Sequence, residues 1–174
     1  KNHGKVIMAL RNLKEKFPKI VYTCIGYGDE EENLKKLVIE LNLENHVVFL
    51  NDISNELKNA LIAKSDVFIM PSIIHKTSVE GFGISFIEGF GISFIEAAQY
   101  GIPSIGGKDG GASDAITHNV SGLICDGNSL DDVYSSICSM FENNKHLEYG
   151  RNAKEKVSKF YWSKIIDQYN KILN

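Results

Sequence analysis

Apolar residues recur along the chain at two alternating periods, one typical of helices and the other of buried strands. Between residues 6 and 17 they are three or four positions apart, which predicts a helix that Pro18 ends. Residues 20–25 form a nearly continuous β-branched run, as expected of a strand covered on both faces. The same alternation predicts further helices at 29–41, 54–61, 92–100, 129–141, 146–160 and 162–173, and further strands at 46–50, 66–70, 102–105 and 122–125.

The order of these elements indicates the fold class. Strands that alternate with helices through short links favour right-handed crossovers, so we predict an α/β fold with a Rossmann-like parallel sheet and helices on both faces. We expect residues 1–174 to form a single domain. Ligands of such sheets bind beyond the carboxyl ends of the strands, where Gly26, Asp52, Ser72 and Gly106 should lie. Because the chain starts directly in a helix, we expect it to be truncated at its N-terminus and to lack at least one strand and a partner domain.

Composition narrows the class of protein. A chain of 174 residues with 43% hydrophobic content can bury one well-packed core, and a formal net charge of −3 argues against a nucleic-acid partner. Cys24, Cys125 and Cys138 are an odd count without metal-ligand spacing, so we predict buried thiols in a reducing compartment and no metal site. No segment resembles a signal peptide or approaches ~20 apolar residues, which predicts a soluble, cytoplasmic protein.

An eight-residue segment occurs twice in tandem, and it carries the candidate chemistry. Residues 81–88 are repeated at 89–96, which places Glu80, Glu88 and Glu96 at equal spacing around two Gly-Phe-Gly turns. Glycines that lead into a helix expose backbone N–H groups, which together with the helix dipole favour an anion such as phosphate. A carboxylate beside that anion is tolerated if it accepts hydrogen bonds from hydroxyl groups. The motif therefore predicts a ligand that joins phosphate to sugar rings, such as a nucleotide sugar.

The segment 79–114 also resembles a known family. It contains Glu-Gly-Phe-Gly, a helix Ile-Ser-Phe-Ile-Glu-Ala-Ala-Gln-Tyr-Gly, the strand Ile-Pro-Ser-Ile and a glycine pair before Asp114. These motifs are similar to those in the donor-binding domain of family-four (group 1) retaining glycosyltransferases, and nearly the whole chain fits the pattern. The resemblance implies one half of a GT-B enzyme, whose acceptor domain is N-terminal and whose donor domain is C-terminal. The resemblance implies that this chain contains only the donor domain.

The resemblance also implies roles for individual residues. Lys1 matches the lysine of a basic pair that binds the donor diphosphate, and the partner arginine would lie upstream. The glutamate that opens Glu-Gly-Phe-Gly receives hydroxyls of the donor sugar, the following amides bind the diphosphate, and the glutamate eight residues later binds the ribose. The backbone near Asp52 and Ile53 would contact the base. The substrate is then a nucleoside-diphosphate sugar, and no metal or cofactor is required.

The two copies of the motif compete for these roles. We favour the second copy, because its helix continues into the segment tethered to the next strand. Glu88 is then the catalytic candidate, and the donor-binding residues are Gly89, Phe90, Gly91, Ile92 and Glu96. In the alternative, Glu80 is the catalytic candidate and the first copy binds the donor through Gly81, Phe82, Gly83 and Ile84. If the second copy holds the site, the first becomes a loop whose apolar residues could mediate self-association.

The resemblance predicts an enzyme that transfers a sugar to a glycan or lipid acceptor. Its partners would be the nucleotide-sugar donor, the missing N-terminal acceptor domain and, for the full-length enzyme, the inner face of the membrane. We expect the isolated fragment to be inactive. The alternative is a non-catalytic nucleotide-sugar binding module, or pseudoenzyme, whose site the repeat has disrupted. A GT-B sugar-nucleotide epimerase is a weaker third hypothesis.

Three further features have structural explanations. Gly26-Tyr27-Gly28 is better explained as a turn than as a phosphate loop, because the four acids at 29–32 would repel phosphate. Residues 106–111 match no phosphate-binding loop and are predicted to form a flexible loop on the binding edge. Asp114 is predicted to cap the short helix that follows the glycine pair.

Overall fold

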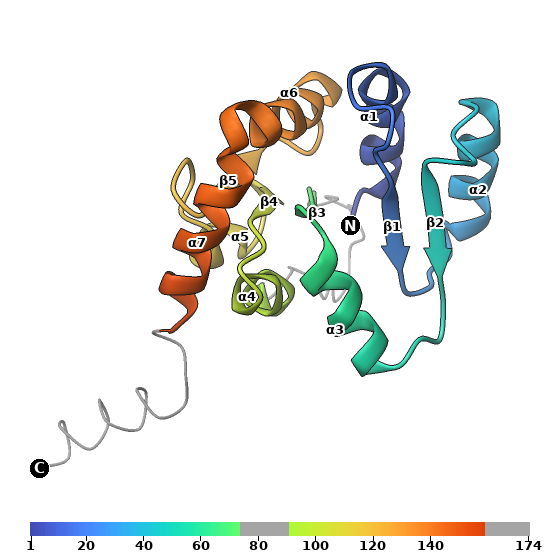
Figure 1. Ribbon diagram of the computed structural model, residues 1–174. Helices are drawn as coiled ribbons and strands as arrows, with labels where there is room; N and C mark the ends of the chain where they lie inside the picture. The colour runs from blue at the N-terminus through green and yellow to red at the C-terminus, as the bar shows by residue number, and fades with distance from the viewer. Residues whose placement is uncertain (74–90, 159–174) are drawn as a thin grey trace, which may run out of the picture.

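The computed structural model describes residues 1–73 and 91–158 (Figure 1). Its elements are α1 (His3–Lys16), β1 (Tyr22–Ile25), α2 (Glu31–Glu40), β2 (Val47–Leu50), α3 (Asn55–Lys64), β3 (Phe68–Met70), α4 (Ile92–Gln99), β4 (Ser104–Gly107), α5 (Ala112–Ala115), β5 (Gly122–Cys125), α6 (Leu130–Phe141), a 3-10 turn (Glu142–Asn144) and α7 (Lys145–Val157). The predicted alternation of helices and strands is confirmed over these ranges. The strand predicted at 102–105 begins two residues later, and the helix predicted at 162–173 lies outside the described residues.

All strand pairs are parallel, and helices flank the strands, which confirms the predicted α/β class. The strands form two sheets, one of order β1-β2 and one of order β3-β4-β5. Tyr22 pairs with Val47 in the first sheet, and Ser104 pairs with both Phe68 and Gly122 in the second. Among the described strands none pairs with the second edge of β1 or of β3, so the predicted sheet is divided between these two strands.

Helix α1 holds the two sheets together through apolar packing. Ile7 and Leu13 of α1 are fully buried and belong to one core cluster. The same cluster includes Val47 of the first sheet and Ile105 and Leu123 of the second. Full burial of an aliphatic side chain of this size contributes about 1.5–3 kcal/mol. The contact between the sheets therefore depends on side chains rather than on strand pairing.

Local signals set the ends of several helices. Ser54 Oγ accepts a hydrogen bond from the Leu57 amide at 3.2 Å, and Ser129 Oγ accepts one from the Asp132 amide at 3.2 Å. Each serine thereby satisfies one backbone amide that has no acceptor within its helix. The prediction for Asp114 was wrong, because this residue lies inside α5 and the N-cap position belongs to Gly111.

Close backbone packing joins the segments around Pro71 and Ser72, just after β3. A Cβ atom at Gly107 would lie 2.1 Å from the carbonyl oxygen of Ser72, and one at Gly127 would lie 2.3 Å from that of Pro71. No side chain fits at these distances, so glycine is required at both positions. Gly106, which we expected after the strand, lies within β4 because the strand extends through Gly107.

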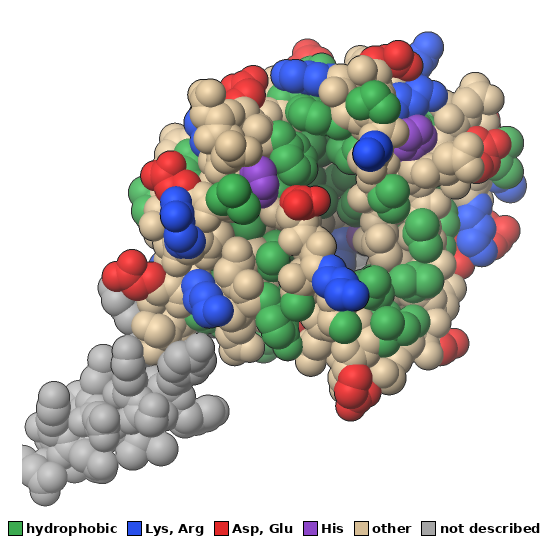
Figure 2. Space-filling model, in the orientation of Figure 1, with side chains coloured by type: hydrophobic (Ala, Val, Ile, Leu, Met, Phe, Trp, Pro, Cys, Tyr) green, Lys and Arg blue, Asp and Glu red, His purple; other side chains and the backbone are tan. Residues whose placement is uncertain are grey.

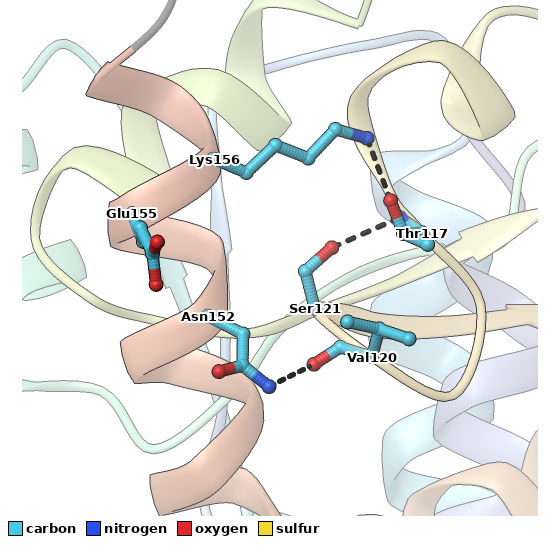
Figure 3. Close-up of a pocket in the computed structure, with 6 residues that line it drawn as sticks. All are labelled: Thr117, Val120, Ser121, Asn152, Glu155 and Lys156. Carbon is cyan, nitrogen blue, oxygen red and sulfur yellow. Dashed lines mark hydrogen bonds between the residues drawn. The ribbon is translucent and has the colours of Figure 1, made fainter.

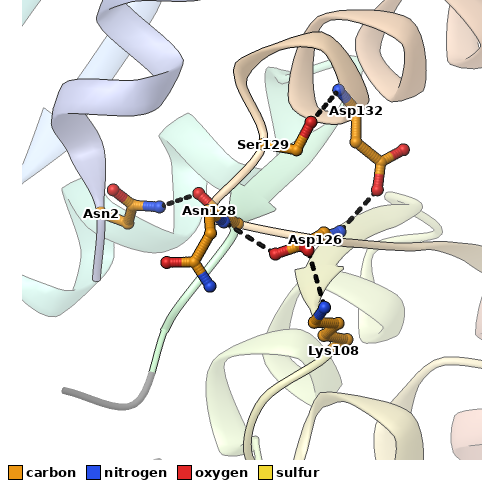
Figure 4. A network of polar contacts seen from close by, with 7 residues as sticks. Asn2, Lys108, Asp126, Asn128, Ser129 and Asp132 are labelled. Carbon is orange, nitrogen blue, oxygen red and sulfur yellow. Dashed lines mark hydrogen bonds and ion pairs between the residues drawn. The ribbon is translucent and has the colours of Figure 1, made fainter. Parts of the chain in front are cut away.

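A polar network secures the same region (Figure 4). The Asn2 side chain donates hydrogen bonds to the carbonyl oxygens of Gly127, at 2.6 Å, and Pro71, at 3.2 Å. Lys108 forms an ion pair with Asp126 at 2.7 Å, which fixes the start of the loop that follows β4. The hydrogen bond from Lys108 is the main reason that the pKa of Asp126 is below its ordinary value. The N-terminus and the ends of β3, β4 and β5 are thereby held together.

The three cysteines are buried and unbridged, as predicted. Burial raises the pKa of Cys24 to about 11 and that of Cys125 to about 12, so both remain protonated thiols near neutral pH. In the portion of the chain that the structure describes, no helix combines the length and apolarity needed for a membrane span. Figure 2 shows acidic and basic side chains interspersed over the face drawn, which is hollowed near its centre and has hydrophobic side chains around the hollow.

We predict that Gly107→Ala destabilises the protein because the added Cβ collides with the backbone of Ser72. The free energy of unfolding should fall by about 1–3 kcal/mol, a typical cost of forcing an extra methyl group into a packed site. Chemical denaturation measures this change. Gly28→Ala is the matched control, since a Cβ there meets nothing within 4 Å. Equal stability of the two variants would contradict the proposed packing constraint.

A second prediction concerns Asn2, which has a left-handed φ of 64°. Asn2→Gly keeps this backbone conformation accessible but removes the donor shared by two carbonyl groups, and should cost about 1–3 kcal/mol. Asn2→Ala should cost about 1 kcal/mol more, because a Cβ atom disfavours positive φ. Urea unfolding of both variants separates the two effects. If Asn2→Gly is as stable as the unchanged chain, the two hydrogen bonds contribute nothing.

Candidate functional site

The loops that follow β1, β2 and β3 mark the expected ligand edge. Figure 1 shows that β1 and β2 point toward the side where α3 and α4 lie. Gly26 comes directly after β1, and its amide donates to the carbonyl oxygen of Leu50 at the end of β2. Asp52 and Ser72 follow the ends of β2 and β3. The structure therefore places these three residues after the strand ends, as predicted.

The N-terminus of α4 lies in the second copy of the repeat. Its N-cap is Gly91, with a left-handed φ of 70°, and its first helical residue is Ile92. A Cβ atom at Gly91 would lie 2.9 Å from the Phe94 ring and 3.3 Å from the carbonyl oxygen of Gly111. Glycine thus satisfies both the conformation and the space available there. The prediction that the tethered helix starts in this copy is confirmed.

Two buried residues fix the orientation of α4. Phe94 packs edge-on against Phe68 of β3, with ring centroids 5.6 Å apart, and Ala97 is fully buried. On the outward side, Ile92 is 68% exposed and Glu96 is half-buried. The first amide groups of a helix have no acceptor within the helix, and its dipole favours an anion at this end. The geometry suits a phosphate group near Ile92 and a hydroxylated group near Glu96.

Glu96 has a charged partner on α3. Lys58 Nζ lies 3.2 Å from each carboxylate oxygen of Glu96, and the two side chains are 29% and 36% exposed. Both groups are therefore accessible to a ligand. Lys58 has no signal in the sequence, because 38 residues separate it from Glu96 and no periodic spacing links the two.

The loop between β2 and α3 contains the residues expected near the base. Asp52 is exposed and has a left-handed φ of 51°, while Ile53 is half-buried and leads into the Ser54 cap. Asn51 donates to both carboxylate oxygens of Glu31 at 2.9 Å, which ties this loop to the start of α2. Helix α3 therefore connects the loop at 51–54 directly to the Lys58–Glu96 ion pair.

Of the remaining predicted site residues, Lys1 lies in the described part of the chain. Lys1 is exposed and adjoins Asn2, whose side chain is bonded at the ends of β3 and β5. This arrangement brings Lys1 to the strand-end side of the molecule. The remaining candidates lie outside the described residues: Glu80, Gly81, Phe82, Gly83, Ile84, Glu88, Gly89 and Phe90.

A separate pocket of about 350 Å³ lies between α7 and the turn before β5 (Figure 3). Its lining residues are Thr117, Val120, Ser121, Asn152, Glu155 and Lys156. Asn152 donates to the Val120 carbonyl oxygen at 2.8 Å, and Lys156 donates to the Thr117 hydroxyl at 2.9 Å. The pocket is at the amino end of β5, away from the strand-end edge, and these polar groups already bind one another.

Comparison with known proteins identifies the family of the chain. Residues 1–157 match the family model described as glycosyl transferases group 1. A GDP-mannose-dependent alpha-(1-6)-phosphatidylinositol monomannoside mannosyltransferase of Mycobacterium tuberculosis is 30% identical over 161 residues, which are 91% of this chain and 40% of the relative.

Two solved structures show the same fold. The Anabaena protein HepE, in complex with UDP-glucose, superposes with a TM-score of 0.73 at 24% identity, over 98% of this chain and 44% of HepE. The C-terminal domain of a group 1 glycosyl transferase from Francisella tularensis has a TM-score of 0.73 at 20% identity, over 91% of this chain and 78% of that domain.

The chain spans about two fifths of the length of the curated relative and of HepE. The family match nevertheless covers most of the chain, including β3, α4 and the glycine-rich segment after β4. The protein therefore belongs to the group 1 family of glycosyltransferases.

Proposed function

We propose that this chain is the donor-binding domain of a retaining glycosyltransferase that transfers a sugar from a nucleoside-diphosphate sugar to a glycan or lipid. The observation that carries the proposal is the start of α4 at Gly91, with an accessible carboxylate at Glu96. A helix N-terminus suits the diphosphate, and a carboxylate suits the ribose hydroxyls. Family membership supports the same conclusion.

The leaving group of such a reaction is a nucleoside diphosphate, whose charge increases as the sugar bond breaks. Amides at residues 89–92 and the Lys1 ammonium group would stabilise that charge, with little reorganisation because the α4 backbone is already fixed by packing. Glu88 is the proposed catalytic residue that receives the donor-sugar hydroxyls, with Glu80 as its alternative. The backbone at Asp52 and Ile53 would contact the base.

The names of similar proteins support a nucleoside-diphosphate sugar as the donor. They do not agree on the base. One relative is named for GDP-mannose, and HepE was solved with UDP-glucose. The relative's name also specifies a phosphatidylinositol monomannoside, which supports a lipid-linked acceptor. Because the relatives are much longer, we infer that transfer requires an acceptor domain and that the isolated chain is inactive.

A non-catalytic nucleotide-sugar binding module is the second candidate, and the tandem repeat favours it. An extra eight residues directly before α4 can displace the first glutamate of the motif from the donor sugar. Such a protein would bind nucleotides without transferring a sugar. The following two tests measure nucleotide binding and sugar recognition separately.

We predict that the chain binds at least one of UDP, GDP and ADP, and that Glu96→Gln weakens this binding about 10- to 100-fold. The reason is the loss of charge-assisted hydrogen bonds to the ribose, which contribute about 1.5–3 kcal/mol. Titration calorimetry measures both affinities. Glu155→Gln is the control, because Glu155 lines the pocket at the opposite edge. If no diphosphate binds, or if both variants lose affinity equally, the proposed site is wrong.

We also predict that Glu88→Gln weakens binding of the nucleotide sugar while leaving binding of the free nucleotide unchanged. The loss should be about tenfold, since this carboxylate would contact the sugar alone. Glu80→Gln should have no effect on either ligand. Competition between the diphosphate and its sugar ester gives the two affinities. If Glu80→Gln is instead selective for the sugar and Glu88→Gln weakens binding of both ligands, the first copy of the repeat forms the site.

A further inference from the structure

The ion pair between α3 and α4 has a geometry that leaves the carboxylate of Glu96 able to accept further hydrogen bonds. Lys58 Nζ is equidistant from the two oxygens, at 3.2 Å from each. These contacts are longer than a typical charge-assisted hydrogen bond of 2.7–2.9 Å. A carboxylate has about four lone-pair sites, so one ammonium group does not saturate it. Two neighbouring hydroxyl groups can still bind to the same carboxylate.

The position of Lys58 is itself well defined. It lies in the first turn of α3, and its backbone amide donates to the carbonyl oxygen of Ser54 at 2.9 Å. Ser54 also caps the helix through its side chain. The start of α3 is therefore rigid, and Lys58 is held close to the loop that contains Asp52 and Ile53.

Stability alone does not account for this ion pair. With 29% and 36% of the two side chains exposed, water partly screens the pair, so its contribution to the stability of the protein is modest. The positive charge of Lys58 is better explained by the proposed nucleotide site. A carboxylate next to a diphosphate raises the local negative charge, and a lysine bonded to that carboxylate offsets it.

We infer that Lys58 is a positioning residue for nucleotide binding. It holds the Glu96 carboxylate in the orientation that accepts both ribose hydroxyls and balances its charge beside the diphosphate. The inference rests on the proposed function, because it assigns the ribose to Glu96. Lys58 acts through Glu96 and not through a contact of its own with the ligand.

The test uses the nucleoside diphosphate that binds the chain most tightly among UDP, GDP and ADP, together with its 2′,3′-dideoxy form. Lys58→Met should weaken binding of the ribonucleotide roughly tenfold, within the coupling range of residues in one hydrogen-bonded network. Binding of the dideoxy nucleotide should change less than about twofold, because it lacks the hydroxyls that Glu96 binds. Lys58→Met combined with Glu96→Gln should bind no more weakly than Glu96→Gln alone.

Two further variants serve as controls. Lys64→Met makes the same change in the last turn of α3, at an exposed position, and should bind both nucleotides as the unchanged chain does. Lys58→Arg retains a cation that can bond to the carboxylate and should restore most of the ribonucleotide affinity. Thermal unfolding of each variant confirms that the samples compared are folded.

The outcomes separate this inference from the function on which it rests. If Lys58→Met binds the ribonucleotide as the unchanged chain does, the inference fails and the proposed function stands. Equal losses for the ribonucleotide and dideoxy forms, additive with Glu96→Gln, would show a direct phosphate contact or a structural effect and also overturn it. If the unchanged chain binds none of the three diphosphates, the proposed function fails and the inference fails with it.

Discussion

The close approach of backbones around Pro71 and Ser72 is the constraint on which the rest of the site depends. Gly107 and Gly127 bring β4 and the loop after β5 to within van der Waals distance of this segment, and Asn2 bonds across it. The chain enters residues 74–90 directly after Ile73, the neighbour of Ser72. The position at which the chain leaves β3 is therefore fixed by backbone contacts, and small changes of side-chain volume there would move it.

Helix α1 supplies the second requirement, a connection between two sheets that share no strand pairing among the described residues. Its buried side chains pack against residues of both sheets, and Asn2 at its start reaches the ends of β3 and β5. The same helix thus joins the halves of the core and places Lys1 near the ends of β3 and β5, at the proposed ligand edge. Both the packing of the core and the positioning of the proposed diphosphate site therefore depend on α1.

The sequence predicted the features whose causes are local. Apolar periodicity, and the caps at Ser54 and Ser129, act on residues only a few positions away along the chain. The helices that depend on them were therefore predicted well. Strand β4 was displaced by two residues because Gly106 and Gly107 have no side chains to produce a pattern. The division into two sheets and the Lys58–Glu96 pair depend on contacts between distant segments, for which a single sequence contains no periodic signal.

Tertiary contacts fix the helix that begins in the second copy of the duplicated motif. Both copies contain the same eight residues, so intrinsic helix propensity cannot distinguish them. In the second copy, Phe94 packs on Phe68 of β3, and Ala97 is buried where its carbonyl accepts from Ile102 as the chain turns toward β4. These contacts require a helix that is joined to β4 by the short segment at 100–103. Glu96 is consequently the glutamate whose position is set by the core and by Lys58, and ribose recognition is the proposed role with the firmest structural basis.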